Sequence, residues 1–550
     1  MWPSLGWARE PFAGGSGVKR EESSLMDREV PGSDDRLMID APRSLMSPDM
    51  SWFGVLEHHA RLTPDKAIAV FGDDVVTYRR MADLSAAAAA GLHRRGVGNG
   101  DVVGLLSYNN IEFLATIFAA NYLGAIVMPL NWRLAAAEIR FILEHSQARA
   151  LVCDGALVDL ANEATKQCDG LVRVCISATN VAGWEQFSGL GDAPVLLTRA
   201  HVHGDDVHRL MYTSGTTGRP KGVMITYANL AWKNYAHIAE CGFTGADVGL
   251  ACGPLYHVGA LDLTTTSLIA VGATTIIHST FDAERVVDTI ERSRITAIWM
   301  APAMVRAVLD LPRIEERDLT SVRLIIGGGE KMPIPFIERI QRAFPSAWFA
   351  DAYGLTETVS GDTFLDRAST RSKLGSVGTP CQYLEVDIWD EGGASVAPHE
   401  HGEIVLRGPK VFKGYWRDPG ATATAFEGGW FHTGDIGMKD DDGYLYIVDR
   451  LKDMIVSGGE NIASSEIERV LYEHESVLEA AVVGRPDARW GEVPVAYVVL
   501  NAAATLTPED LIEYCRGQLA RFKIPKAVEF IDALPRNPSG KVLKRELRDR

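Results

Sequence analysis

A chain of 550 residues with a formal net charge of −17 is long enough for more than one domain and lacks the positive balance that nucleic-acid binding requires. Its hydrophobic content of 46% is ordinary for a globular enzyme, and its longest apolar stretch, residues 111–130, is broken by Gly124 and Pro129, which favours a buried helix and strand over a membrane span. The seven cysteines show no CxxC spacing, so neither a zinc site nor a disulfide framework is indicated, and free thiols in a reducing cytoplasm are expected.

The first 50 residues differ in composition from the rest. They are rich in Gly, Ser, Pro and charged residues, and they lack the continuous apolar stretch of a signal peptide. Residues 1–50 are therefore expected to be a disordered tail, or to precede the native start of translation.

From residue 51 the hydrophobic pattern alternates between strands and helices. A short strand at 67–71 precedes a helix over 78–95 that Thr77 can cap, and the apolar run 102–107 is typical of a strand buried on both faces. Further strands are expected at 125–129, 150–153, 274–278, 297–300 and 322–327, with helices near 111–123, 135–145 and 281–293. This alternation predicts an α/β fold in which helices cover mostly parallel sheets.

Two later regions have a different pattern. Between residues 375 and 446, short strands separated by Gly, Pro and Asp turns indicate an antiparallel or barrel-like subdomain. Further on, Ser465 and Glu468 form a capping box for one helix, and Thr507 with Pro508 starts another. The expected organisation is a large N-terminal domain over residues 51–451 and a small α+β C-terminal domain over residues 452–550.

The most informative stretch, residues 212–222, reads Tyr-Thr-Ser-Gly-Thr-Thr-Gly-Arg-Pro-Lys-Gly and follows an apolar strand. Its glycines let backbone N–H groups approach an anion, its hydroxyls add donors, and Lys221 adds a point charge suited to phosphate. Pro220 stands where a Walker A loop has glycine, which excludes that motif. The residues expected to wrap a polyphosphate are Thr213, Ser214, Gly215, Thr216, Thr217, Gly218 and Lys221.

This stretch resembles the signature loop of the adenylate-forming (ANL) superfamily, which includes acyl- and aryl-CoA ligases, peptide-synthetase adenylation domains and luciferases. Three further segments resemble motifs of the same superfamily, and the resemblance covers residue 51 to the end. Residues 351–357, Asp-Ala-Tyr-Gly-Leu-Thr-Glu, resemble its Tyr-Gly-x-Thr-Glu motif. The resemblance implies that Tyr353 stacks on adenine, that Thr356 contacts the α-phosphate, and that Glu357 binds Mg²⁺ together with Thr213.

Two other segments extend the implied nucleotide site. Asp435, in the segment 429–435, and Arg450 downstream are implied to bind the ribose hydroxyls. Residues 329–333 depart from the Gly-Ala-Pro sequence that usually flanks adenine, and Asp351 replaces the usual Asn. The remaining nucleotide contacts implied by position are Gly329, Glu330, Lys331, Asp351, Ala352 and Gly354.

The C-terminal region carries residues that the resemblance assigns to the two chemical steps. Lys541, in Asn-Pro-Ser-Gly-Lys, matches the superfamily lysine that offsets repulsion between the substrate carboxylate and the α-phosphate. Lys452 matches the hinge about which the small domain rotates between the half-reactions. The segment implied to line the channel for the CoA thiol arm contains Ser457, Gly458, Gly459 and Glu460.

The sequence indicates the acid-binding residues less clearly than the nucleotide-binding ones. Residues 254–257, Pro-Leu-Tyr-His, resemble the superfamily's Pro-Leu-Phe-His motif, which implies that His257 lies beside the substrate carboxylate. The lining implied by position also includes Tyr256, Trp299, Met300, Gly327 and Gly328. The bulk of Trp299 and Met300 suggests a medium-sized or aromatic acid, although a rotated Trp299 would leave room for a longer chain. Asp262, in an apolar segment, has no role that the sequence explains.

Together these segments predict an acyl-CoA ligase that uses ATP and Mg²⁺. The acid and ATP give acyl-AMP and pyrophosphate, and CoA then displaces AMP. The predicted substrate is a medium- or long-chain fatty acid or a related acid, and an aryl acid of the cinnamate or benzoate type is the alternative. The rivals are an enzyme that loads a carrier protein, a luciferase-like oxygenase, and a non-enzymatic homologue, which the presence of Lys541 and Glu357 disfavours. The expected partners are small molecules, and association as a homodimer is left open.

Overall fold

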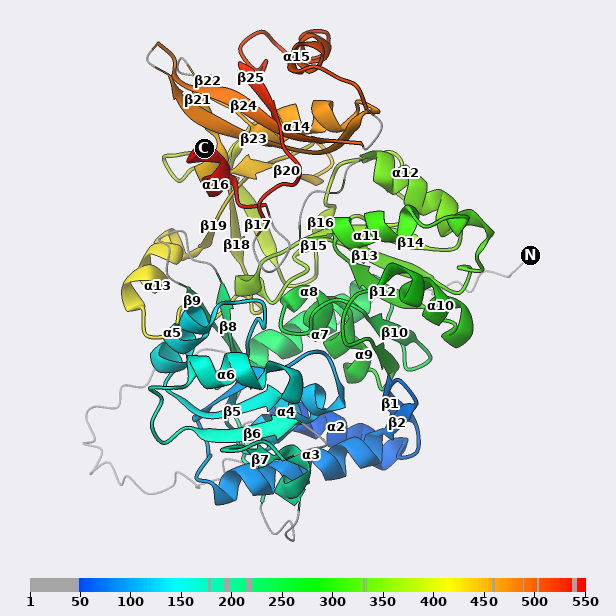
Figure 1. The fold of residues 1–550 in the computed structure, drawn as a ribbon, viewed down its shortest axis with the longest axis vertical. Coiled ribbons are helices and arrows are strands. Elements are labelled where there is room, and N and C mark those ends of the chain that lie inside the picture. The colour runs from blue at the N-terminus through cyan, green and yellow to red at the C-terminus, as the bar shows by residue number, and fades with distance from the viewer. Residues whose placement is uncertain are drawn as a thin grey trace, which may run out of the picture. The chain divides into compact units, whose positions relative to one another are not determined.

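The described residues form four β-sheets, two of them large and associated with helices (Figure 1). The structure is a computed structural model, and it describes residues 49–176, 180–191, 198–213, 220–329, 332, 334–457, 460–487, 489–501, 504–536 and 542–550. The large N-terminal region of mostly parallel sheets and the small α+β C-terminal region agree with the fold class predicted from the sequence.

A seven-stranded sheet carries the predicted phosphate segment at one edge. Its strands are β3 (Val102–Leu106), β4 (Ile126–Pro129), β5 (Ala148–Asp154), β6 (Val172–Ile176), β7 (Glu185–Gln186), β8 (Val207–Thr213) and β9 (Lys221–Thr226). Their order is β7-β6-β5-β3-β4-β8-β9, and every neighbouring pair runs parallel except the β8–β9 hairpin. The helices of this region are α2 (Trp52–Leu62), α3 (Tyr78–Arg94), α4 (Ile111–Tyr122), α5 (Ala136–Ser146) and α6 (Val158–Ala164). As predicted, Thr77 caps α3, because its hydroxyl accepts from Arg80 N.

A nine-stranded sheet carries the other predicted contacts. Its strands are β1 (Ala67–Phe71), β2 (Asp74–Thr77), β10 (Val248–Ala251), β11 (Thr274–Ile277), β12 (Ala297–Met300), β13 (Leu324–Gly327), β14 (Trp348–Tyr353), β15 (Thr363–Phe364) and β16 (Thr379–Pro380). Their order is β16-β15-β14-β13-β12-β10-β11-β1-β2. The helices are α7 (Tyr227–Cys241), α8 (Val258–Ala260), α9 (Thr266–Ala270), α10 (Ala283–Ser293), α11 (Pro302–Leu309) and α12 (Ile334–Ala343), with a π-helical turn, Leu261–Thr265, between α8 and α9.

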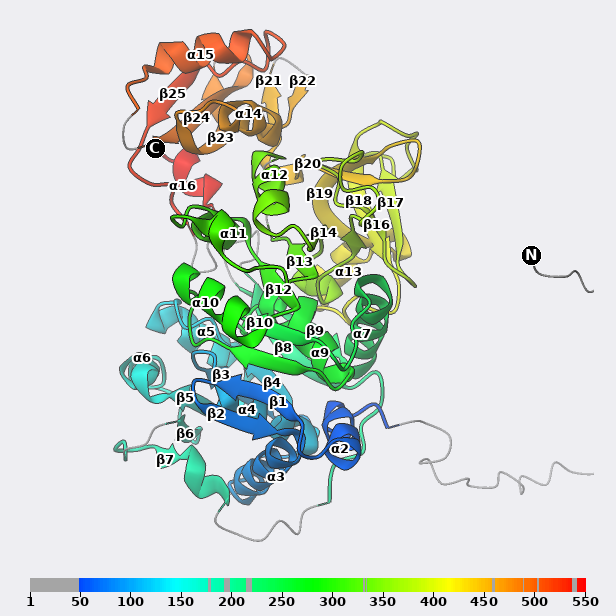
Figure 2. The same ribbon diagram turned by 90° about the vertical axis from the view of Figure 1, so that its right-hand side faces the viewer.

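The first strand of the chain does not join the sheet that its place in the sequence suggests. β1 pairs in parallel with β11 of the nine-stranded sheet and not with β3, the next parallel strand along the chain. Helix α4 contacts β3 and β4 of one sheet and β1 of the other (Figure 2). Because it lies between two sheets, α4 is apolar on nearly every face and almost entirely buried.

The subdomain expected after residue 375 is antiparallel, as predicted. It consists of β17 (Glu385–Trp389), β18 (Gly402–Arg407), β19 (Phe431–Lys439) and β20 (Leu445–Arg450), in that order, with α13 (Pro419–Ala425) beside it. Each neighbouring pair runs antiparallel. The β19–β20 register places Asp435 directly opposite Arg450.

The C-terminal region has its own sheet and its own cores. The sheet contains β21 (Ile455–Ser457), β22 (Glu460–Ile462), β23 (Val477–Asp487), β24 (Gly491–Leu500) and β25 (Ala527–Phe530), and the helices are α14 (Ser464–Tyr472), α15 (Pro508–Arg516) and α16 (Lys544–Arg548). Two hydrophobic clusters consist only of residues after position 454. Thr507 caps α15 as predicted.

The predicted capping box at Ser465 is wrong. The N-cap of helix α14 is Ala463, two residues before Ser465, and it makes no side-chain cap. The Glu468 carboxylate instead accepts from Val482 N at 2.8 Å and pairs with Lys544 at 2.7 Å. The Glu468 side chain, which the local sequence pattern assigned to a helix cap, therefore makes a tertiary contact instead.

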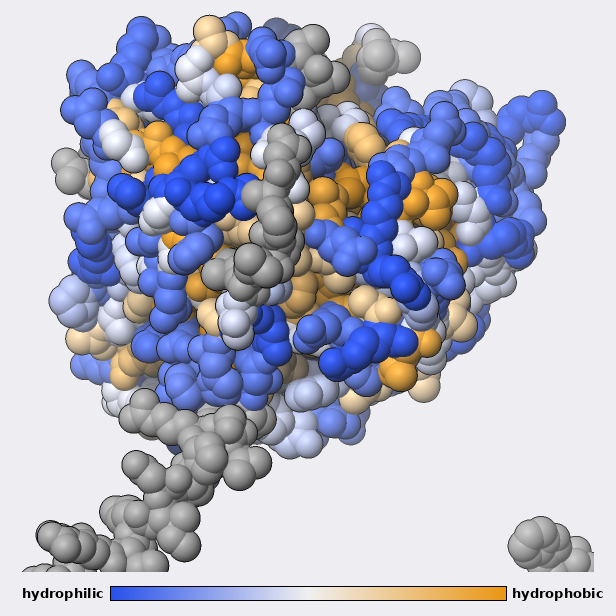
Figure 3. Space-filling model, turned by 90° about the horizontal axis from the view of Figure 1, so that it is seen from below, coloured by the Kyte–Doolittle hydropathy of each residue, from blue (hydrophilic) through white to orange (hydrophobic). Residues whose placement is uncertain are grey.

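Polar residues occupy much of the face seen from below, with apolar patches between them (Figure 3). Within the described part of the chain, no helix combines the length and the apolar character that crossing a membrane requires.

Candidate functional site

An antiparallel hairpin holds the two ends of the predicted phosphate segment. Thr213, the last residue of β8, pairs with Lys221, the first residue of β9. The Lys221 ammonium nitrogen lies 4.8 Å from the centre of the Tyr415 ring, so this cation stacks on an aromatic face. The hairpin therefore presents Thr213 and Lys221 at the same point of the sheet edge. The predicted contacts Ser214, Gly215, Thr216, Thr217 and Gly218 lie outside the described residues.

Glu357, the predicted metal ligand, lies on a short 3₁₀ turn, Thr356–Thr358. The Tyr415 hydroxyl donates to Glu357 Oε1 at 3.0 Å. Burial raises the pKa of the Glu357 carboxyl, and the hydrogen bond from Tyr415 lowers it. Tyr415 therefore contacts both residues that were predicted to hold phosphate and metal. Tyr415 is not among the residues predicted from the sequence, because an aromatic residue after Gly414 has no signature of its own.

The chemistry around Glu357 fits a divalent cation that arrives with a nucleotide. The Asp435 carboxylate is close enough to raise the pKa of Glu357, and Arg450, which pairs with Asp435, lowers it. Among the described side chains, no group of three or more His, Cys, Asp or Glu could hold a metal ion by itself. Mg²⁺ commonly takes one or two carboxylates and completes its shell with water and substrate phosphates. The residues present therefore fit Mg²⁺ held by Glu357 and by ATP.

Tyr353, Asp435 and Arg450 come from three different strands and meet in the structure. Tyr353 OH donates to Asp435 Oδ2 at 2.8 Å, and Arg450 Nε lies 3.4 Å from Asp435 Oδ1. The Asp435 side chain is only 8% exposed. Burial raises the pKa of the Tyr353 hydroxyl well above its usual range, so this group remains a donor at neutral pH. The carboxylate is thus fixed in one orientation, which suits its predicted contact with two vicinal ribose hydroxyls.

The predicted adenine side is built where β13 and β14 end. Asp351 is buried on β14, opposite Gly327 of β13. A Cβ at Gly328 would lie 3.0 Å from the Ala352 carbonyl oxygen, and a Cβ at Gly354 would lie 2.3 Å from Gly361 N. The close approach of neighbouring backbone therefore requires glycine at position 354 and makes any larger residue a tight fit at position 328. Glu330 and Lys331 lie outside the described residues.

The predicted acid side centres on His257, which caps the short helix α8. His257 Nδ1 accepts from Gly259 N at 3.1 Å, so the proton of the neutral ring lies on Nε2. The imidazole stacks on Trp299, with ring centroids 6.4 Å apart and planes 23° apart. Tyr256, the preceding residue, is buried with its ring edge-on to Trp132. Burial raises the pKa of Tyr256 to about 12.

Trp299 and Met300 were both predicted to line the acid pocket, but they do not share a face of β12. Trp299 packs against Gly253 and Gly259, where an added Cβ would lie 2.5 Å from the indole. Met300 belongs to a separate core cluster beneath α10 and α11. Because side chains alternate along a strand, only Trp299 is brought beside His257.

The predicted hinge and CoA segment follow β20. Lys452 lies in a 3₁₀ turn, Leu451–Asp453. Arg548 from α16 donates to the Lys452 carbonyl oxygen at 3.1 Å and pairs with Asp453 at 2.7 Å. Ser457 ends β21 and pairs with residue 460 of β22. Gly458, Gly459 and Lys541 lie outside the residues that the structure describes, so their predicted roles stay predictions.

Comparison with known proteins agrees with this geometry. Residues 56–416 match the AMP-binding enzyme family, and residues 466–541 match the AMP-binding enzyme C-terminal domain. A feruloyl-CoA synthase from Amycolatopsis sp is 39% identical over 492 residues, which is 89% of this chain and 97% of that protein. A long-chain-fatty-acid–CoA ligase from Mycobacterium tuberculosis is 38% identical over 479 residues, which is 86% of this chain and 93% of that protein.

A solved structure is similar over nearly its whole length. The o-succinylbenzoate CoA synthetase from Bacillus subtilis, in complex with its acyl-adenylate intermediate, shares 32% identity and a TM-score of 0.79, covering 90% of this chain and 98% of that chain. Fold, site and relatives define an ATP-dependent acid–thiol ligase that uses Mg²⁺ and CoA. The chain belongs to the AMP-binding enzyme family, as the resemblance of residues 212–222 implied.

Proposed function

We propose that this enzyme forms the CoA thioester of an aryl or arylalkyl carboxylic acid. The observation that carries the proposal is the packing of Trp299 beside His257. The indole is 5% exposed and lies against two glycines on one side of its strand. A planar, rigid wall next to the carboxylate-binding position suits a planar ring better than a flexible chain, because flat surfaces stack with offset rings at little entropic cost.

The packing of Trp299 also supports the proposal, because it opposes a turn of the indole that would make room for a long acyl chain. Gly253 and Gly259 contact the indole so closely that even a methyl group at either position would overlap it, so the ring fills its space. Turning it would leave a void against both glycines and remove its stacking on His257. The structure therefore favours the aryl alternative over the fatty acid as substrate.

The proposed reaction has two chemical steps, and the residues of the site have separate roles in the first. In the first step an oxygen of the acid carboxylate attacks the α-phosphorus of ATP, and the bond to pyrophosphate breaks. In this proposal His257 Nε2–H would donate to the acid, Glu357 would hold the metal that accompanies the phosphates, and Asp435 would hold the ribose. Lys541 is proposed, from its motif, to offset the repulsion between carboxylate and phosphate. In the second step the CoA thiolate attacks the acyl carbon and AMP leaves.

The test is pyrophosphate release with a panel of acids, with and without CoA, followed by mass spectrometry of the products. We expect kcat/KM for a cinnamate or indoleacetate to exceed that for dodecanoate by about tenfold or more. Trp299→Ala should shrink this ratio. Met300→Leu, on the opposite face of β12, is the matched control and should leave the ratio unchanged. Equal or higher kcat/KM for dodecanoate in the wild-type enzyme would refute the proposal.

A long-chain fatty acid remains the second candidate, because the Mycobacterium tuberculosis relative is nearly as similar to this chain as the feruloyl-CoA synthase. A carrier protein in place of CoA is the third, and it predicts pyrophosphate release without any acyl-CoA product. We further propose a cytoplasmic location, which the seven unpaired cysteines support, and association as a homodimer, which sedimentation equilibrium would test.

A further inference from the structure

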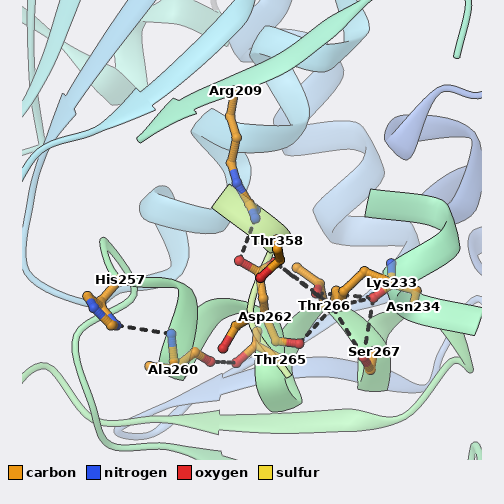
Figure 4. A network of polar contacts seen from close by, with 12 residues as sticks. Arg209, Lys233, Asn234, His257, Ala260, Asp262, Thr265, Thr266, Ser267 and Thr358 are labelled. Carbon is orange, nitrogen blue, oxygen red and sulfur yellow. Dashed lines mark hydrogen bonds and ion pairs between the residues drawn. The ribbon is translucent and has the colours of Figure 1, made fainter. Parts of the chain in front are cut away.

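Asp262, which the sequence left unexplained, lies in a buried cluster of charged and polar side chains. It pairs with Arg209, and both side chains are at most 1% exposed. The Lys233 ammonium group, also fully buried, lies 4.0 Å from Asp262 Oδ1. We call this group the Asp262 cluster; its members are Arg209, Lys233, Asn234, Asp262, Thr266 and Ser267 (Figure 4).

The Asp262 cluster joins elements that carry the predicted substrate sites. Arg209 comes from β8, the strand that ends at Thr213 of the phosphate segment. Lys233 comes from α7, which follows the other strand of that hairpin. Asp262 comes from the π-helical turn that follows α8, the helix capped by His257. The cluster therefore ties the phosphate side of the molecule to the acid side.

The Lys233 ammonium group makes three short hydrogen bonds. It donates to Asn234 Oδ1 at 2.6 Å, to the Asp262 carbonyl oxygen at 2.7 Å and to Thr266 Oγ1 at 2.6 Å. Burial lowers the pKa of Lys233 to about 7, while Asp262 raises it and Arg209 lowers it. The three hydrogen bonds hold the ammonium group in one place, although Arg209 Nε and Asn234 Nδ2 in the same cluster are buried without a hydrogen-bond partner among the described residues. Such a buried polar network fixes geometry, whereas apolar residues of similar volume would stabilise the fold at least as well.

Two hydrogen bonds connect the turn that contains Asp262 to the segment that begins at His257. Leu261 N donates to the His257 carbonyl oxygen at 3.1 Å, and Thr265 Oγ1 donates to the Ala260 carbonyl oxygen at 2.9 Å. Figure 4 shows His257 on one side of Asp262 and Lys233 on the other. The turn between them is π-helical, a geometry that is rare and concentrated at functional sites. A shift of Asp262 would therefore also shift helix α8 and the His257 imidazole that caps it.

We propose that Asp262, held by Arg209 and Lys233, is a positioning residue that fixes the π-helical turn and thereby sets the place of His257 and of its Trp299 neighbour for acid activation. The proposal rests on the assignment of His257 to the acid side of the site. Asp262 touches no substrate itself; it acts through the turn.

The direct test replaces Asp262 by Asn and measures pyrophosphate release with the acid and ATP varied separately. Misplacing His257 should lower kcat/KM for the acid about 10–10²-fold and leave KM for ATP within about twofold of the wild type. Asp247→Asn is the matched control, because Asp247 is buried in a two-point ion pair with Arg323, at 2.8 Å on each side, in the same sheet region but away from His257. It should lower the melting temperature without changing KM for the acid.

Two further variants separate positioning from stability. Thr265→Val removes the bond to Ala260 without touching a charge, and it should reproduce the loss in acid kcat/KM in a folded protein. Arg209→Met combined with Asp262→Leu replaces the ion pair by apolar side chains, which should restore the melting temperature but not the use of the acid. Full activity in either folded variant would overturn the proposal.

A double-mutant cycle tests whether Asp262 acts through His257. If it does, Asp262→Asn combined with His257→Ala should be no slower than His257→Ala alone, since the shared function is already lost. Additive losses would overturn the proposal. If His257→Ala by itself leaves acid activation unchanged, the assignment of His257 fails, and that result is distinct from a failure of Asp262 to position it.

Discussion

Tyr415 offers the sharpest test of the phosphate and metal side of the site, because one side chain makes two separable contacts. Its hydroxyl donates to Glu357 at 3.0 Å, and its ring lies under the Lys221 ammonium group at 4.8 Å. Tyr415→Phe removes the first contact and keeps the second. Tyr415→Leu removes both.

The expected magnitudes follow from the two contacts. A hydrogen bond to a charged group contributes about 1.5–3 kcal/mol, and Glu357 is partly exposed, so the lower value applies. That corresponds to about a tenfold rise in the Mg²⁺ concentration needed for half-maximal activity in Tyr415→Phe. Loss of a cation–π contact at a partly exposed position costs about 0.5–1 kcal/mol, so Tyr415→Leu should in addition raise KM for ATP about two- to fivefold.

The assay is pyrophosphate release against free Mg²⁺ at fixed ATP and acid, at pH 6 and pH 8.5. The Tyr415 hydrogen bond lowers the pKa of Glu357, so its removal should make the Mg²⁺ defect larger at pH 6. Tyr444→Phe is the matched control, since Tyr444 donates to the carboxylate of Asp366 at 2.7 Å, away from Glu357. Identical Mg²⁺ curves for the wild type and Tyr415→Phe at both pH values would show that Glu357 does not bind the metal.

Three other outcomes test the remaining parts of the site. Lys541→Ala should slow adenylation about 10²–10³-fold, and it should still convert pre-formed acyl-AMP to thioester; equal losses in both half-reactions would contradict its role. Lys452→Pro should impair thioester formation more than adenylation in single-turnover measurements, because proline restricts the backbone rotation at the proposed hinge. Burial raises the pKa of Glu357 above its ordinary value of 4.5, so protons compete with Mg²⁺ at higher pH than for a free carboxylate. Activity should therefore fall as pH falls, and added Mg²⁺ should shift that fall to lower pH; a pH profile that does not respond to Mg²⁺ would count against the assignment.

The identity of the protein was accessible from the sequence because it depends on residues that are contiguous. The two ends of the segment 212–222 pair with each other, and Tyr353, Thr356 and Glu357 lie within a few residues at the end of one strand. The alternation of strands and helices likewise follows from local hydrophobic period, and it predicted the fold class correctly.

Contacts between distant segments could not be predicted in this way. Nothing near Tyr415 in the sequence indicates that its hydroxyl meets Glu357, and nothing near β1 indicates that it pairs with β11. The pairing of Glu468 with Lys544 in place of a helix cap has the same origin. In each case the contact is made by a residue far away in the sequence, which the local pattern does not contain.

The amino-acid sequence by itself determined the enzyme class, the nucleotide motifs and the order of the elements, because each depends on short stretches whose chemistry and period are local. Only the tertiary structure decided that Trp299 and not Met300 faces His257, and that Asp262 forms a buried ion pair with Arg209. The physical reason is that the face of a strand and the partner of a buried charge are set by which elements pack together. That packing is a property of the whole chain.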